Sequence, residues 1–360
     1  MSTFPRAPRF PSLALPLLLL ASAAALGEGP LAPGELGVHQ AIRDGALTLF
    51  PVTLVARSAT EVDFILLDEG LASGAVAITE KGGPAEDPEQ APQPQQVQEV
   101  EQVEQAQQTI EVQQIAGSGA QVNKLSVRND SDRPLLLVAG EMIRGARQDR
   151  IVAHDTTIPP KTAVDDIDVF CVESGRWASD SGEFRSAKAV SSSEIRATAQ
   201  LQKSQKEVWD TVSRTNAAVG ATSDTGSLSA AYDKPEVKAR TLAAQARLEA
   251  ELARIPGVCG VVVAIGGRIV VADVFTDPDL FRRLQGKLLA GYLLDAVSSP
   301  PTDAAPPTEE VTRRYLAAVL AAAWVEDWRG GDLVVERFET TEARGTRSSW
   351  MGEEIHINSY

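Results

Sequence analysis

Apolar and polar residues alternate in short runs through the first half of the chain. Runs of this length, rich in Val, Ile and Leu and bounded by Gly, Pro, Asn or Asp, predict β-strands. The cluster Asn129–Pro134 is typical of a turn and predicts a hairpin between the strands on either side. Glu61–Gly70 is too short for its periodicity to separate a helix from a strand. The predicted strands are Leu47–Val55, Gly74–Thr79, Val122–Val127, Leu135–Val138, Arg150–Ala153 and Ile167–Val172.

Helical spacing of the apolar residues begins after residue 177. Ser191–Glu194 has the pattern of a capping box, and the apolar residues from Ile195 to Val212 then share one face of a predicted helix. Further helices are predicted to start at Pro235, Asp277 and Thr308, and strands near the C-terminus are predicted at Leu333–Phe338 and Ile355–Ile357.

A second pair of strands is predicted late in the chain. Val258–Ile265 and Arg268–Phe275 flank Gly266-Gly267, a dipeptide that suits a two-residue hairpin turn. Runs of strands followed by helices predict an α+β fold. We expect mainly antiparallel sheets in the N-terminal half, and helices with a further β-hairpin in the C-terminal half.

We expect one α+β domain over residues 36–357, after a signal peptide over residues 1–27. Residues 84–114 interrupt this domain with a stretch of Gln, Glu and Pro in which Val is almost the only apolar residue. Such a stretch buries too little apolar surface to offset the entropy cost of ordering it. It is therefore predicted to be a disordered insertion.

The N-terminus has the composition of a secretory signal peptide. Arg6 and Arg9 form a positively charged region, Leu13–Leu20 is largely apolar, and Ala21–Ala25 supplies small residues for cleavage. The apolar run is shorter than the roughly 20 residues that span a bilayer. We therefore predict an exported protein, periplasmic or secreted, with no transmembrane segment after cleavage.

Net charge limits the classes of partner. Cleavage would remove Arg6 and Arg9, so the formal charge of −15 would become −17. Such a field repels phosphate backbones. Non-specific binding to nucleic acid is therefore not expected, and a site for an anion has to be local.

The two cysteines, Cys171 and Cys259, both lie in apolar runs. In an oxidising compartment they have one possible disulfide, and two buried free thiols are the alternative; the sequence leaves both open. The apolar setting also argues against Cys171 as a nucleophile. Three histidines make a histidine-rich metal site unexpected, and glycines that punctuate strands do not form a dinucleotide fingerprint, so no cofactor is expected.

Two passages concentrate guanidinium groups in this acidic chain. The first has three arginines at a spacing of three, and the second places a carboxylate, a guanidinium and an indole within five residues. Fork-shaped donors and a flat ring suit an anionic ligand with a planar part, such as a nucleotide derivative. The alternative is an internal network of salt bridges and turns. The candidate residues are Glu141, Arg144, Arg147, Gln148 and Arg150 in the first passage and Glu173, Arg176 and Trp177 in the second.

The same passages resemble a known family. Glu141–Arg150, followed by Val169–Trp177, is similar to the ARG and rhodanese-phosphatase-superfamily-associated protein family, whose name refers to ADP-ribosylglycohydrolases. The similarity covers residues 47–357 and points to the same site residues, with Cys171 added. Relatives often have a doubled glycine where this chain has Gly145-Ala146. The resemblance implies an association with ADP-ribose-related genes but no defined activity.

Two functions follow as hypotheses. In the first, both passages form a cleft for an anionic ligand, and in an enzymatic form Glu141 or Glu173 acts as general base while the arginines neutralise a phosphate. In the second, the protein is a non-catalytic envelope protein that binds a protein or glycan partner, and both passages serve the fold. The sequence leaves open whether the protein is an enzyme.

Overall fold

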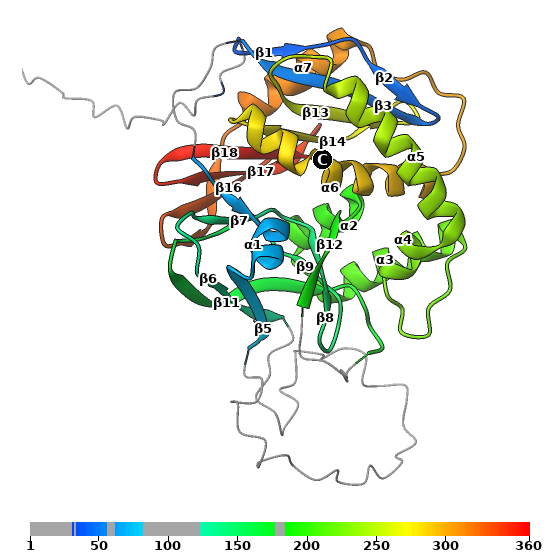
Figure 1. Cartoon of the computed structure of the whole chain (residues 1–360). Coiled ribbons are helices and arrows are strands. Elements are labelled where there is room, and N and C mark those ends of the chain that lie inside the picture. Colours follow the sequence, from blue (N-terminus) through cyan, green and yellow to red (C-terminus); the bar gives the residue numbers. More distant parts are fainter. Residues whose placement is uncertain (1–30, 32–33, 56–61, 82–122, 177–183) are drawn as a thin grey trace, which may run out of the picture.

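The computed structural model describes residues 31, 34–55, 62–81, 123–176 and 184–360. The predicted signal peptide, the predicted insertion over residues 84–114 and Trp177 lie outside the described residues. Within the described residues, three β-sheets pack with helices (Figure 1).

The largest sheet has nine strands, all of them antiparallel to their neighbours. Their order is β1-β3-β13-β14-β18-β17-β16-β15, with β2 also paired to β3. Strand β13 is buried at every position, which explains why its sequence is an apolar run instead of an alternation. The strands are β1 (Leu36–Val38), β2 (Ile42–Asp44), β3 (Leu47–Leu54), β13 (Val258–Ile265), β14 (Arg268–Phe275), β15 (Val325–Gly330), β16 (Leu333–Glu339), β17 (Arg344–Trp350) and β18 (Glu353–Ser359).

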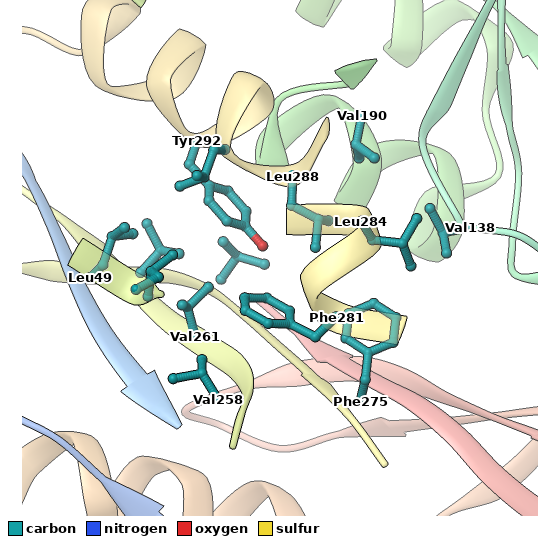
Figure 2. Close-up of a cluster of buried hydrophobic side chains, with 14 of the residues drawn as sticks. Leu49, Val138, Val190, Val258, Val261, Phe275, Phe281, Leu284, Leu288 and Tyr292 are labelled. Carbon is teal, nitrogen blue, oxygen red and sulfur yellow. The ribbon is translucent and has the colours of Figure 1, made fainter. Parts of the chain in front are cut away.

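Helices cover both faces of this sheet. On one face, α5 (Pro235–Leu252) and α6 (Pro278–Ser298) share a core with β3 and β13, and Figure 2 shows Leu288 of α6 within it. On the other face, α7 (Glu309–Leu320) contributes Leu316 to a separate core. Among the described helices, none is long and apolar enough to cross a membrane.

The second sheet has six strands in the order β12-β8-β9-β11-β6-β5, and its end strands β5 and β12 approach each other. A three-stranded sheet, β10-β7-β4, shares one apolar core with it. The strands are β4 (Ile65–Leu66), β5 (Val76–Glu80), β6 (Lys124–Asn129), β7 (Leu135–Leu137), β8 (Glu141–Gly145), β9 (Arg150–Val152), β10 (Thr156–Ile158), β11 (Thr162–Cys171) and β12 (Phe184–Val190).

A helical segment follows β12 and contacts both larger sheets. Helix α2 (Ser193–Ala197) continues into a π-helical turn (Thr198–Gln202), and α3 (Gln205–Val219) begins after a break. The prediction of one continuous helix here is wrong. Lys203 has a left-handed φ of +54°, which ends the first helix, and the Ser204 side chain caps the second by accepting a backbone N–H at 3.3 Å.

The α+β fold class and the hairpin at Gly266-Gly267 are confirmed. The hairpin predicted across Asn129–Pro134 is wrong, because β6 pairs with β5 and β11, whereas β7 pairs with β10 and, in parallel, with β4. The turn therefore connects two different sheets. The ambiguous segment before residue 70 is strand β4 followed directly by helix α1 (Leu67–Ser73); the remaining helix, α4 (Ser229–Asp233), precedes α5.

Candidate functional site

The first passage forms two antiparallel strands and the turn between them. Strands β8 and β9 pair through Met142 with Ile151, and Asp149 Oδ1 accepts a hydrogen bond from the Gly145 N–H at 3.2 Å across the turn. Ala146 in this turn has φ +45°, a left-handed conformation that glycine adopts at lower cost.

The two passages meet at the pairing of β9 with β11, where Arg150 lies opposite Cys171. The Arg150 side chain is fully buried, and its Nη2 donates to both carboxylate oxygens of Glu80 at 2.9 and 2.8 Å. Its Nη1 donates to the Gln148 carbonyl at 2.9 Å. Glu80 ends β5, which the sequence did not connect with either passage.

The Arg176 guanidinium also donates its hydrogen bonds to acceptors of the same chain. Its Nε and Nη2 donate to the two oxygens of Glu173 at 2.9 and 2.7 Å, Nη2 also reaches Asp149 at 3.2 Å, and Nη1 donates to the Ala146 carbonyl at 2.5 Å. All three guanidinium nitrogens therefore have acceptors. We call Glu80, Asp149, Arg150, Glu173 and Arg176 the motif cluster.

Hydroxyl groups of the loop before α4 and of the first residue of α4 complete the motif cluster. Glu173 accepts from Thr225 Oγ1 at 2.6 Å and Asp149 accepts from Ser229 Oγ at 2.6 Å. Burial alone would raise the pKa of Glu173, but the hydrogen bonds from Arg176 and Thr225 lower it below its ordinary value. A carboxylate held ionised in this way is a weak base.

Glu141 does not join the motif cluster. It starts β8 and lies about 13 Å along that strand from Gly145, at a rise of about 3.3 Å per residue. Its side chain is 1 % exposed, bonds to Lys287 Nζ of α6, and accepts from the Val138 N–H at 3.3 Å. Burial raises the pKa of Glu141.

The structure gives contacts or burial for three of the remaining candidate residues. Arg144 Nη1 donates to Asp233 of α4 at 2.9 Å, the Arg147 N–H donates to Glu80 at 3.2 Å, and the Gln148 side chain is fully buried. Trp177 lies outside the described residues, so its predicted stacking role stays a prediction.

A second set of buried charges was missed by the sequence reasoning. Asp273 of β14 accepts from Arg196 Nη2 at 2.6 Å and from His356 Nε2 at 3.0 Å, while His356 Nδ1 lies 2.8 Å from Asp155 Oδ2. Tyr292 also donates to Asp273, and Figure 2 shows this tyrosine on α6 among apolar side chains. We call these five residues the central network.

The two residues that precede the first passage support the central network through their backbone. The Ala139 N–H donates to Asp155 Oδ1 at 2.8 Å. Gly140 has φ +77°, and a Cβ on it would lie 2.6 Å from Cδ of Arg196. A glycine is required here because any side chain would occupy the place of the Arg196 methylene groups.

Burial and the two neighbouring carboxylates have opposite effects on the pKa of His356. Burial alone would lower its pKa, but Asp155 and Asp273 raise it to about 9. His356 is therefore charged at neutral pH and balances its carboxylate neighbours. A sequence signal existed for Asp273, which is a single polar residue inside an apolar strand run, and such a residue is buried only with partners.

Cys171 and Cys259 are both buried, and no disulfide joins them in the structure. Their strands, β11 and β13, belong to different sheets. Burial raises the pKa of Cys171 to about 11 and that of Cys259 to about 12. Thiols this weakly ionised are poor nucleophiles.

We expect neither thiol to react with Ellman's reagent at pH 8 while the protein is folded, because both are buried and protonated. In guanidinium chloride two thiols per chain should react at once. The absorbance of the released thiolate measures both results. Rapid labelling of the folded protein would show that one cysteine is accessible.

No group of three or more His, Cys, Asp or Glu side chains in the described part of the chain is arranged to hold a metal ion.

Comparison with known families gives one decisive result. The family model for the ARG and Rhodanese-Phosphatase-superfamily-associated Protein domain matches residues 35–360. The chain belongs to this family. The matched residues include both passages. The resemblance to this family is therefore confirmed. Comparison with curated proteins and with solved structures gave no match.

Proposed function

We propose that this protein is an exported, non-catalytic member of its family that binds a partner in the cell envelope, and that both arginine-containing passages stabilise its fold. The observation that carries the proposal is the neutralisation of the motif cluster from within the chain. Arg150 and Arg176 face the three carboxylates of Glu80, Asp149 and Glu173.

An anion would gain little from this arrangement. Sites for phosphate or carboxylate ligands use guanidinium groups whose donors are free to form paired hydrogen bonds. Here the cluster has more carboxylates than guanidinium groups, and an entering anion would have to displace a carboxylate from Arg176. The geometry therefore favours the scaffold role over a ligand cleft.

The candidate general bases fit catalysis poorly. Glu173 is held ionised by Arg176, and Glu141 is buried against Lys287, away from the cluster. A general base has to reach the proton that it removes, directly or through one water. Neither carboxylate combines access with a pKa near neutrality, which supports a non-catalytic role.

Substitution of Arg176 separates the two roles. We expect Arg176→Gln to lower the free energy of unfolding by about 1–3 kcal/mol, because it leaves the buried carboxylates of Glu173 and Asp149 short of a donor. Urea unfolding followed by circular dichroism measures this. Arg128→Gln is the matched control, since the Arg128 side chain is 60 % exposed, and it should unfold like the parent. An Arg176→Gln variant as stable as the parent would remove the support for a scaffold role.

A further inference from the structure

Both ring nitrogens of His356 face carboxylates. Nδ1 lies 2.8 Å from Asp155 Oδ2, and Nε2 lies 3.0 Å from Asp273 Oδ1. A carboxylate only accepts hydrogen bonds, so each contact requires an N–H on the ring. Imidazole carries two N–H groups only in its charged form. Phe275 stacks on the ring at a centroid distance of 4.1 Å and fixes its plane.

The two contacts of His356 join different parts of the fold. Asp273 and His356 lie on neighbouring strands, β14 and β18, of the nine-stranded sheet. Asp155 lies between β9 of the six-stranded sheet and β10 of the three-stranded sheet. The contact at Nδ1 therefore links the nine-stranded sheet to the other half of the molecule, whereas the contact at Nε2 stays within one sheet.

The other donors decide which contact a neutral ring would keep. Asp155 Oδ2 also accepts from Ser348 Oγ at 2.6 Å, so it keeps a donor if Nδ1 loses its proton. Among the described residues, Asp273 Oδ1 accepts from His356 alone, because Arg196 and Tyr292 donate to Oδ2. An orphaned buried carboxylate oxygen is costly. The neutral ring therefore keeps its proton on Nε2.

We propose that His356 is a pH-operated latch between the two halves of the molecule, closed while the ring is charged and released from Asp155 when Nδ1 loses its proton. Release removes a charge-assisted hydrogen bond from Asp155 and leaves the neutral one from Ser348, which is present in both states. The titratable groups that act on His356 are Asp155, Asp273 and Glu354. Arg196, Tyr292 and Tyr360 act on its carboxylate partners.

The direction of the pH effect follows from the position of the pKa. Burial lowers the pKa of His356, but Asp155 and Asp273 raise it to about 9, above the ordinary value of about 6.5. The latch therefore stabilises the fold fully below about pH 6.5 and loses this contribution as the pH rises through about 9. Burial raises the pKa of Glu354 to about 7, so its negative charge is added before His356 titrates.

Two measurements on the full chain test the latch. The chain has three histidines, so the ring signals in NMR spectra can be assigned with His39→Gln and His154→Gln variants. We expect the His356 signal to titrate with a midpoint near pH 9. Amide hydrogen exchange in residues 135–158, corrected for the intrinsic pH dependence, should rise by about tenfold or more over the same range. A His356 midpoint near pH 6.5 would overturn the proposal. So would an amide exchange rate that does not change across the pH range in which His356 titrates.

Two variants distinguish a latch from a merely buried histidine. Asp155→Asn keeps an acceptor but removes one charge, so the His356 midpoint should fall and protection should be lost at lower pH. Ser348→Ala removes the donor that remains after release, so the midpoint should be no lower than in the parent and the rise in exchange larger. Identical titrations in the parent and in Asp155→Asn would contradict the latch, and folding of either variant is checked at pH 6.

Discussion

Replacing Arg196 by methionine is expected to lower the free energy of unfolding by about 3–5 kcal/mol. Arg196 is 1 % exposed and its partner Asp273 is fully buried, with 2.6 Å between Nη2 and Oδ2. Removing the guanidinium leaves a buried carboxylate with fewer donors, whereas methionine keeps the unbranched chain that packs beside Gly140. Urea unfolding at pH 7 measures the loss.

A double variant separates the lost charge pair from lost packing. Arg196→Met combined with Asp273→Asn removes the orphaned charge, so it should be more stable than Arg196→Met alone. If the single variant loses less than about 1 kcal/mol, Asp273 does not depend on Arg196 and the central network is not the support that we describe.

The second large effect is expected at Arg150. Arg150→Met should also lower the free energy of unfolding by about 3–5 kcal/mol, because the Glu80 carboxylate is 9 % exposed and would lose both hydrogen bonds from Nη2. The guanidinium also lies 5.3 Å above the Phe184 ring, a cation–π contact that methionine cannot make.

A double-mutant cycle between Arg150 and Glu80 measures their coupling directly. We expect a coupling of about 2–3 kcal/mol in the cycle that uses Arg150→Met and Glu80→Gln. The exposed pair Lys206–Asp210 on α3 is the control and should give no measurable coupling. Equal couplings in the two cycles would mean that the motif cluster is no stronger than a surface ion pair.

Elements defined by local signals could be predicted from the sequence. The Gly266-Gly267 turn, the Asp277 cap of α6 and the apolar run of β13 each depend on neighbouring residues, and each matches the structure. The turn at Asn129–Pro134 shows the limit. Its residues specify a reversal of the chain but not the partner of the next strand, which is set by distant strands.

The site was harder to predict because its partners are far apart in the chain. Three arginines at a spacing of three look the same whether they bind an anion or a carboxylate of the same chain. The partner of Arg150 is Glu80, a carboxylate of the same chain that lies 70 residues away in the sequence. The central network is more dispersed still, since His356 meets Asp155 across 201 residues, and no motif spacing encodes such a contact.

The central claim is that the arginines of the motif cluster are engaged within the chain and do not hold a ligand. Isothermal titration calorimetry of the protein with ADP-ribose, and separately with inorganic phosphate, tests it most directly. The account predicts no saturable heat of binding at low salt, where charge-driven binding is strongest. Saturable one-to-one binding of either anion that Arg176→Gln abolishes and Arg128→Gln retains would contradict it.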